Sequence, residues 1–256
     1  MKPMFEEMAK APAAWLSGSG DEALVVLEKV AAQRGSPLTV VGRDVSFNAG
    51  DHSLADQSLV IFDRKSSTEE PKSVILRIPL LGAHQVVNAV TAYAALKASG
   101  LDVSDEAIRI GFADVKWPCR FEILPGEPVV ILDSAHNLDS FEKLDQTLED
   151  YFPGRPVILI FGASEDKDMQ GMLALLKSRL THVLATRALH PRAIEPENIV
   201  EMANSLGIHS EMATPVEAAL ERALEIAGHD GGVVLSAGSM FVTAEVKTAW
   251  EKIYRP

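Results

Sequence analysis

The chain has 256 residues, of which 47% are hydrophobic and 23% charged, and its formal net charge is −12. This length allows one large or two modest domains of ordinary soluble composition, and the acidic balance argues against nucleic acid or an anionic membrane as partner, because phosphates are bound by basic faces. No apolar segment approaches the ~20 residues of a membrane span, and the N-terminus lacks the apolar core of a signal peptide. A single cysteine excludes an internal disulfide framework. We therefore expect a cytoplasmic protein.

Residues 1–118 combine helices and strands without a regular alternation. Apolar residues at helical spacing predict three helices, Asp21–Gln33, Ala83–Ala98 and Asp105–Phe112. Ser104 has the residue type of a cap for the third. Two aliphatic runs predict paired strands on either side of a polar turn: Leu59–Phe62 and Val74–Ile78, with Asp63–Lys72 between them. Prolines and a glycine follow, so we place an interdomain hinge at residues 119–126.

From residue 127 onward short buried strands alternate with helices. The predicted strands are Val129–Leu132, Val157–Phe161, Val183–Ala185 and Val233–Ser236. The predicted helices are Leu138–Tyr151, Met169–Leu180, Pro196–Leu206 and Pro215–Ala227. Thr214 has the residue type of an N-cap, with Pro215 at the first helical position. Repeated βα units imply a mostly parallel sheet covered by helices, so we expect an α/β protein whose residues 127–256 form one doubly wound domain.

The segment Asp133-Ser134-Ala135-His136-Asn137 lies where a predicted strand ends and a helix begins. In open α/β sheets, ligands bind outside the carboxyl ends of the strands. Asp133 is placed to accept hydrogen bonds from ribose hydroxyls, or else to cap the following helix. His136 is a candidate general base, because its unperturbed pKa is near neutral. Asn137 is a candidate cap that aims the neighbouring imidazole.

Polar side chains also share one face of the helix predicted over Ala83–Ala98. His84, Asn88 and Thr91 lie at positions i, i+4 and i+7. The Asn88 amide offers a donor and an acceptor side by side, which matches the N6/N7 edge of adenine. The alternative is that these residues only cap and decorate a helix start.

Two cations lie near predicted junctions. Arg120 at the hinge has the planar fork that binds phosphate, and in phosphoryl transfer such a group offsets developing charge; the alternative is an ion pair with Glu122. Lys167 lies in the loop after Val157–Phe161, which we expect to be adjacent to the loop of His136. The alternative there is solvated charge, with Asp168 capping the next helix. Gly238-Ser239, after the last strand, belongs to the same edge of the sheet.

Three common motifs are absent from the sequence. No GxxxxGK[ST] phosphate loop occurs, Gly18-Ser19-Gly20 lacks the third glycine of a dinucleotide fingerprint, and no Cys/His spacing suggests zinc. We therefore predict no metal-ligating residues in this chain.

Four clusters, in this order, resemble the folylpolyglutamate synthase/dihydrofolate synthase branch of the Mur ligase family. The family pattern Gly-x-His-Gln-x-x-Asn-Ala is matched by Gly82–Ala89, and Phe-Gly-x-x-x-Asp-Lys-Asp by Phe161–Asp168. Trp-Pro-Gly-Arg is matched by Trp117–Arg120 with Cys119 for glycine, and Asp-Gly-Ala-His-Asn by Asp133–Asn137 with Ser134 for glycine. Two later segments, Thr186–Ala193 and Gly238-Ser239, are also similar. The resemblance runs from about Asp21 to the end of the chain.

The resemblance implies an ATP-dependent amide ligase that works through an acyl phosphate. A carboxylate of folate or dihydropteroate is phosphorylated, and L-glutamate then attacks it. Adenine and nucleotide contacts would come from His84, Gln85 and Asn88. Arg120 would contact phosphate and Asp133 ribose. His136 and Asn137 would lie on the glutamate side of the reaction, with Lys167 and Ser239 as neighbours of glutamate or phosphate; His136, Arg120 and Lys167 are the catalytic candidates.

The resemblance also implies a further N-terminal region that carries the phosphate loop and the Mg²⁺ ligands. On this reading residues 1–118 are a remnant of the central ATP-binding domain, residues 127–256 are the glutamate-ligase domain, and the chain alone is inactive. The sequence leaves open whether the chain is a fragment, a natural remnant or a shortened form, and whether it is monomeric. Two other functions stay open: a non-catalytic module that binds nucleotide or glutamate, and a related ligase for another acidic acceptor.

Overall fold

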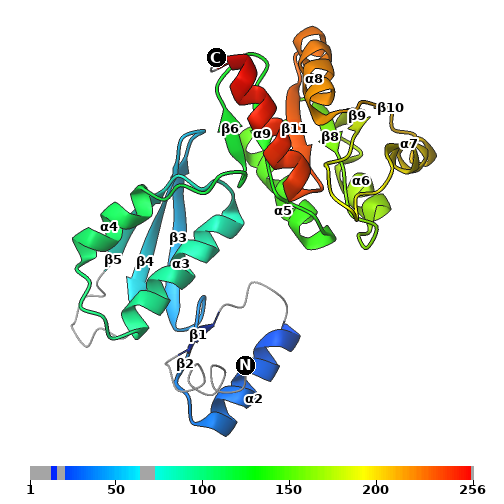
Figure 1. Ribbon diagram of the computed structural model, residues 1–256. Coiled ribbons are helices and arrows are strands. Elements are labelled where there is room, and N and C mark those ends of the chain that lie inside the picture. The colour runs from blue at the N-terminus through cyan, green and yellow to red at the C-terminus, as the bar shows by residue number, and fades with distance from the viewer. Residues whose placement is uncertain (1–12, 16–20, 64–72, 255–256) are drawn as a thin grey trace. The chain divides into compact units, whose positions relative to one another are not determined.

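The computed structural model describes residues 13–15, 21–63 and 73–254 (Figure 1). The chain divides into two compact units, Met1–Lys116 and Trp117–Pro256, called unit 1 and unit 2 below. Residues 64–72, which make up most of the predicted polar turn, lie outside the described residues. No helix in the described ranges is both long and apolar enough to cross a membrane.

Unit 1 contains a three-stranded antiparallel sheet in the order β3-β4-β5. Its strands are β3 (Val45–His52), β4 (Gln57–Asp63) and β5 (Ser73–Ile78). The predicted pairing of the two aliphatic runs is confirmed, because Leu59 lies opposite Leu76 and Ile61 opposite Val74. Helices α3 (Ala83–Ala98) and α4 (Asp105–Ala113) pack on this sheet and close an apolar core with it. The other elements of unit 1 are α2 (Asp21–Arg34) and a parallel pair, β1 (Ala13–Trp15) and β2 (Leu38–Val40).

Helix α3 packs through the face that its apolar spacing predicts. Val86, Val90 and Tyr93 are all buried. The helix begins after Gly82, whose φ of 106° favours glycine. Gln57 is buried on β4 and donates hydrogen bonds from Nε2 to the carbonyl oxygens of Leu80 (2.6 Å) and Gly82 (2.9 Å). The loop that starts α3 is therefore held to the sheet by a buried amide.

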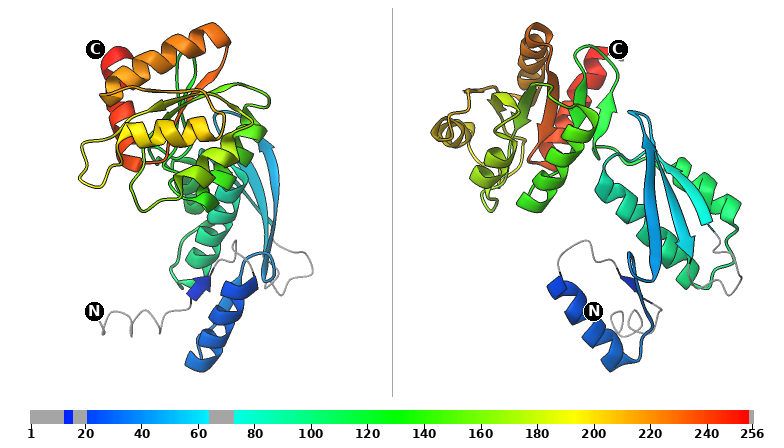
Figure 2. Two further views of the ribbon diagram at one scale, coloured as in Figure 1. Left: turned by 90° about the vertical axis from the view of Figure 1, so that its right-hand side faces the viewer. Right: turned by 180° about the vertical axis from the view of Figure 1, so that it is seen from behind.

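Unit 2 is a six-stranded sheet in the order β10-β9-β8-β11-β7-β6, with helices on both faces (Figure 2). All neighbouring strands are parallel except the β6–β7 pair. The strands are β6 (Glu122–Leu124), β7 (Val130–Leu132), β8 (Val157–Phe161), β9 (Leu180–Ala185), β10 (Ser210–Met212) and β11 (Val233–Ala237). The helices are α5 (Leu138–Tyr151), α6 (Met169–Leu176), α7 (Pro196–Ser205), α8 (Val216–Asp230) and α9 (Met240–Tyr254). The predicted α/β class with a mostly parallel sheet is confirmed.

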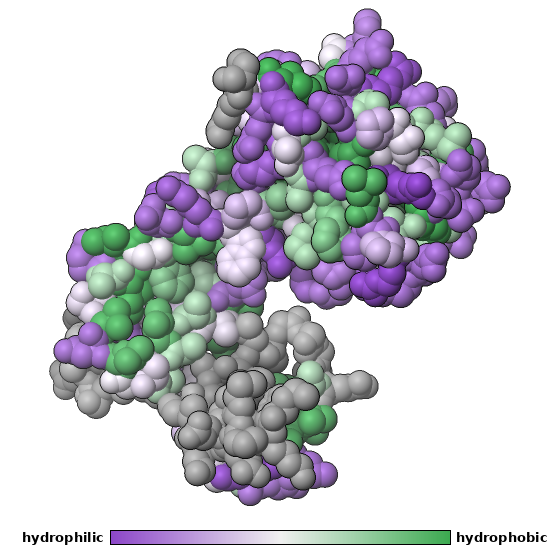
Figure 3. Space-filling view, viewed as in Figure 1, coloured by the Kyte–Doolittle hydropathy of each residue, from purple (hydrophilic) through white to green (hydrophobic). Residues whose placement is uncertain are grey.

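Alternate residues along the central strands face the two helical layers. Ile158 and Ile160 of β8 belong to the core cluster with α8 and α9. Phe161 faces the opposite layer, where its ring meets Phe141 of α5 edge-on with centroids 6.2 Å apart. All five residues of β8 and of β11 are buried. Helices cover both faces of the sheet, and this explains why these strands are almost entirely apolar. On the face seen in Figure 3, hydrophilic side chains lie over much of the outer part of unit 2.

The elements of unit 2 differ from the sequence predictions in several places. The sequence pattern misses β6, β10 and α9; the two strands have three residues each and are too short to show a period. Helix α6 ends at Leu176 rather than Leu180, because Leu180 begins β9. Residues 119–126, assigned to a hinge, lie within unit 2, where β6 pairs with β7.

Side-chain caps begin three of the predicted helices, α4, α5 and α6. The Asn137 side chain accepts from the Ser140 N–H, and the Ser140 hydroxyl in turn accepts from the Asn137 N–H, which closes a capping box. The predicted caps Ser104 and Asp168 are confirmed. The predicted cap Thr214 is wrong: Pro215 itself is the N-cap of α8, and no side chain caps this helix.

Candidate functional site

The carboxyl ends of β7, β11 and β8 lie side by side at one edge of the sheet of unit 2. We call the loops at this edge the rim: residues 133–137, 238–239, 162–168 and 186–194. The prediction that the loop of Lys167 is adjacent to that of His136 is wrong, because β11, the last strand, lies between β7 and β8. Gly238 occupies this middle position with φ 99°, and its N–H donates to the Ala135 carbonyl at 2.8 Å.

Asp133 links two segments of unit 2 through its carboxylate. Oδ2 accepts from the Phe121 N–H at 2.8 Å, and Oδ1 accepts from the Ala135 N–H at 2.7 Å. Burial raises the pKa of Asp133, although these two donors and the charge of Arg120 oppose the shift. Asp133 does not cap α5, since Asn137 does. The carboxylate is thus positioned by backbone donors on both sides.

The two residues that replace family glycines are in direct contact with each other. The Cys119 carbonyl accepts from both the Ser134 N–H (2.9 Å) and the Ser134 hydroxyl (2.8 Å). Cys119 has φ 60° and Phe121 has φ 45°, so Arg120 lies between two residues in the left-handed region. Such a conformation costs a non-glycine residue about 1–2 kcal/mol, and the surrounding bonds hold it in place.

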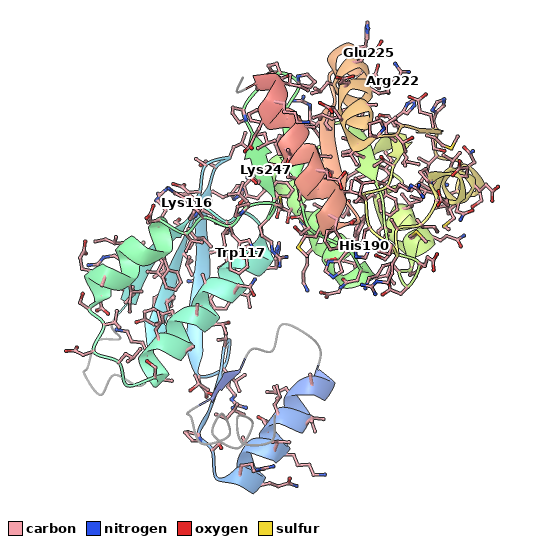
Figure 4. The ribbon with its side chains drawn as sticks, in the orientation of Figure 1. Lys116, Trp117, His190, Arg222, Glu225 and Lys247 are labelled. Carbon is pink, nitrogen blue, oxygen red and sulfur yellow. The ribbon has the colours of Figure 1, made fainter. Side chains whose placement is uncertain are left out.

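Arg120 is exposed in the turn between these two residues. The alternative that it pairs with Glu122 is wrong, because Glu122 pairs with Lys247 of α9 through both carboxylate oxygens, at 2.6 and 2.8 Å. Glu122 Oε2 also accepts from the Cys119 N–H at 2.8 Å. Figure 4 labels Lys247 on α9. The turn is therefore anchored by its neighbours, while the guanidinium of Arg120 is exposed at its surface.

His136 has a defined tautomer in its neutral form. Its Nδ1 lies 2.9 Å from the Ser134 carbonyl oxygen. A carbonyl oxygen only accepts, so Nδ1 carries the hydrogen and Nε2 is a lone-pair acceptor. The His136 N–H donates to the Ser140 hydroxyl at 3.0 Å. The side chain is exposed, so Nε2 is suited to take a proton from a ligand.

Lys167 and Ser239 come from the loops after β8 and β11. Lys167 Nζ lies 3.2 Å from Asp166 Oδ2, and this cation holds the pKa of Asp166 below its usual range. The Ser239 hydroxyl oxygen is 3.5 Å from the Val242 N–H at the start of α9. Both side chains are partly exposed at the rim.

A small hollow opens at the same rim, and most of its wall was missed at the sequence level. Its walls come from three segments that are far apart in sequence, residues 163–164, 187–193 and 239–242. The lining includes Ser164, Arg187, His190, Ser239 and Phe241. Of these only Ser239 was a predicted site residue; polar residues after the end of β9 were the available signal.

In unit 1 the predicted nucleotide residues form one hydrogen-bonded chain on α3. Asn88 Nδ2 donates to Gln85 Oε1 at 3.1 Å, and Gln85 Nε2 lies 3.1 Å from His84 Nε2. Gln85 is buried and Asn88 exposed. One of the two Asn88 N–H groups is used in this chain, which leaves the second N–H and the carbonyl oxygen of the amide to face a ligand.

The candidate residues thus form two separate groups, one on each unit. His84, Gln85 and Asn88 lie together on α3. In unit 2, Arg120 lies in the turn at residues 119–121, and the rim carries the other candidates. Among the described residues, no group of three or more His, Cys, Asp or Glu side chains is arranged to hold a metal ion. These residues therefore do not fit a resident Mg²⁺ site.

Comparison with known proteins finds similarity to ligases over much of the chain. Residues 119–240 match the Mur ligase, glutamate ligase domain family. A Haloferax volcanii protein named probable bifunctional folylpolyglutamate synthase/dihydropteroate synthase is 34% identical over 252 residues, which is 97% of this chain and 29% of that protein.

Solved structures of similar proteins agree with the fold. Escherichia coli FolC in complex with DHPP and ADP has a TM-score of 0.79 and 28% identity, over 96% of this chain and 55% of that one. The Yersinia pestis bifunctional folylpolyglutamate synthase/dihydrofolate synthase complexed with AMPPNP and Mn ion has a TM-score of 0.76 and 25% identity, over 98% and 57%. This chain therefore spans less than two thirds of the length of these relatives.

Proposed function

We propose that the chain supplies the glutamate-binding part of an ATP-dependent amide ligase, because residues 119–240 match the Mur ligase, glutamate ligase domain family and the chain is similar to dihydrofolate synthase/folylpolyglutamate synthase proteins. The acceptor would be folate or dihydropteroate, activated as an acyl phosphate. The amino group of L-glutamate attacks this acyl phosphate, the amide bond forms, and phosphate leaves.

The observation that carries this proposal is the convergence of Asp133, His136 and Ser239 on one rim, at the ends of strands that adjoin in the sheet. The attacking amine must lose a proton as the amide bond forms. His136 presents an unprotonated Nε2 when neutral, which is the form that accepts a proton. Lys167 and Ser239 offer a cation and a hydroxyl donor for the carboxylates of glutamate.

Each of the two groups of residues carries side chains that are suited to contact a nucleotide. Asn88 offers an amide donor and acceptor to adenine, supported by Gln85 and His84. Arg120 offers an exposed guanidinium to phosphate, and Asp133 a carboxylate to ribose. When bound, a divalent cation would neutralise charge on the phosphates. No described cluster in this chain is arranged to hold that cation, and we expect no turnover by the chain alone.

The proposal is tested by measuring ATP and L-glutamate binding to the intact chain by calorimetry, with the variants Asn88→Ala and His136→Ala. Both side chains are exposed, so each variant is expected to fold. Loss of one neutral hydrogen-bonding group weakens binding by about 1 kcal/mol, or about fivefold. We expect Asn88→Ala to weaken ATP binding only and His136→Ala to weaken glutamate binding only, so that each variant is the control for the other.

ATP binding should be weak and nearly independent of Mg²⁺, and no ADP should be released in the presence of dihydropteroate and glutamate. If wild-type protein binds neither ligand, or if both variants weaken both ligands equally, the proposed roles are wrong. ADP release that requires glutamate would show that the chain holds a phosphate site of its own.

A further inference from the structure

The hollow at the rim of unit 2 has fixed walls. The Ile194 N–H donates to the Ala163 carbonyl at 3.1 Å, and Ser164 and Ala193 form an antiparallel bridge. The loop after β8 and the loop after β9 are thereby joined on one side. On the other side, Ser239 and Phe241 come from the loop after β11 and the start of α9.

The hollow is rich in hydrogen-bond donors. His190 Nδ1 accepts from the Arg192 N–H at 3.3 Å, so the hydrogen of the neutral ring is on Nε2. The His190 ring stacks on the Phe241 ring with centroids 4.5 Å apart and planes 20° apart, which holds the imidazole in place. Arg187 contributes a guanidinium and Ser239 a hydroxyl to the same lining. The Nε2–H of His190, the hydroxyl of Ser239 and the guanidinium of Arg187 are hydrogen-bond donors, and the guanidinium is also positively charged. A lining of this kind is suited to bind an anion.

Arg187 already binds a carboxylate, that of Glu195, directly before α7. The two side chains are 48% and 60% exposed, and an ion pair this exposed contributes only about 0–1 kcal/mol. Glu195 makes no side-chain hydrogen bond as the N-cap of α7, so the helix start does not depend on it. Breaking this ion pair would therefore cost little free energy if a ligand carboxylate took the place of Glu195.

We propose that this hollow binds a carboxylate of the incoming amino acid, with Arg187 as the recognising group and Glu195 as an intramolecular competitor for it. The guanidinium fork matches a carboxylate through two parallel hydrogen bonds. The inference rests on the proposed function, and it names the residue pair that sets affinity and specificity for glutamate.

The test is an NMR titration of the intact ¹⁵N-labelled chain with L-glutamate at constant ionic strength, comparing wild type with Arg187→Gln and Glu195→Gln. The matched controls are Arg222→Gln and Glu225→Gln. Arg222 is also an exposed arginine paired with carboxylates, Glu211 and Glu225, and its loss changes the net charge by the same amount. In Figure 4, Arg222 and Glu225 lie at the end of unit 2 opposite to His190.

We expect Arg187→Gln to weaken glutamate binding about tenfold or more, as loss of a charge-assisted contact does. Glu195→Gln should strengthen binding up to about fivefold, because it removes the competitor. Both controls should bind as wild type does. Titrations with L-glutamine, which lacks the γ-carboxylate, and with the α-amide of glutamate, which lacks the α-carboxylate, then show which carboxylate Arg187 binds. The ligand that lacks this carboxylate should bind wild type and Arg187→Gln equally well.

Two outcomes overturn the inference and are distinguishable. If wild-type protein binds glutamate and Arg187→Gln binds it equally well, or no more weakly than Arg222→Gln does, Arg187 is not the recognising group while the proposed function stands. If wild-type protein shows no glutamate binding at all, both this inference and the glutamate role of unit 2 fail. A cooperative thermal melt for each variant establishes that the comparison is between folded proteins.

Discussion

Single residues of unit 2 hold its rim together. Asp133 accepts one N–H from the turn at Phe121 and one from its own loop at Ala135. The Cys119 carbonyl receives two bonds from Ser134. Asp133, which the sequence pattern marks as a ligand contact, is therefore also a structural tie, and a substitution at this position tests both roles.

Asp133→Asn should destabilise unit 2 by about 1–3 kcal/mol, the cost of leaving a buried donor unpaired. The asparagine oxygen replaces one carboxylate acceptor, but its NH₂ group faces the second backbone N–H. Urea denaturation of the wild type and the variant at neutral pH measures the difference. Ser134→Ala is the control, since it removes the hydroxyl bond to Cys119 and keeps the Cβ atom, and it should cost about 1 kcal/mol. If Asp133→Asn lowers the free energy of unfolding by no more than the control does, the carboxylate of Asp133 does not stabilise unit 2 in the way described.

Cys119 adopts φ 60° with a buried side chain, and burial raises the pKa of its thiol. Cys119→Gly relieves about 1–2 kcal/mol of backbone strain, which the loss of a buried side chain and the greater freedom of the unfolded chain offset. We expect a net change within about 1 kcal/mol. Cys119→Val should cost about 2 kcal/mol or more, because a β-branched residue at positive φ is strongly disfavoured.

The same denaturation experiment checks this pair of variants. The comparison is informative because valine keeps apolar volume that glycine removes. If burial alone governed this position, valine would be the better tolerated of the two, and that order would contradict the importance of φ.

At the scale of elements, β9 and β10 are joined by a pair of histidines at one end of the sheet. His209 Nδ1 lies 3.0 Å from His182 Nε2, so the two rings share one hydrogen between them. Glu211 Oε1 lies 3.8 Å from His182 Nε2 and also pairs with Arg222 Nε at 2.7 Å. Burial, and next the charge of His209, lower the pKa of His182.

The histidine pair should make the stability of unit 2 depend on pH. Because the folded pKa of His182 lies below its unfolded value of about 6.5, the unfolded state binds this proton more strongly, and stability falls as the pH falls through that window. His182→Gln should flatten this dependence between about pH 7.5 and about pH 5.5. Melting temperatures across this range measure it, with the exposed His229→Gln as control. If the melting temperatures of wild type and His182→Gln change with pH in the same way, His182 does not contribute to the pH dependence of stability.

At the scale of the whole molecule, each unit contains a core of its own. The core cluster of unit 2 runs from Cys119 to Trp250 and includes Leu124 of β6. Phe121 packs near Tyr151 and Phe152, with ring centroids 5.9 and 6.3 Å apart. The segment before residue 127 is thus part of this core.

Residues 117–256 should fold alone with a cooperative melt, and residues 127–256 should be less stable by about 3 kcal/mol or more. The shorter form loses the burial of Cys119, Phe121 and Leu124, each worth roughly 1–2 kcal/mol, as well as the β6 ladder. Chemical denaturation of the two forms beside the intact chain measures the difference. Equal stability of the two forms would support a boundary at residue 127 instead of 117.

The sequence by itself determined the features that depend on near neighbours. Apolar spacing specified the central strands and most helices, because burial on one or both faces imposes a period. The caps Ser104, Asn137 and Asp168 were predictable for the same reason, since each bonds a backbone group within the first turn. The order of the motifs by itself indicated the resemblance to the ligase family.

Tertiary structure alone decided which loops adjoin. Insertion of β11 between β7 and β8 separates the loop of Lys167 from that of His136, because strand order depends on how crossover helices pack and not on local periodicity. The contact between Cys119 and Ser134, and the hollow that brings Arg187 near Ser239, join segments that are distant in the chain. Such contacts arise only when the sheet forms, since the pattern within a segment carries no information about its partner across the sheet.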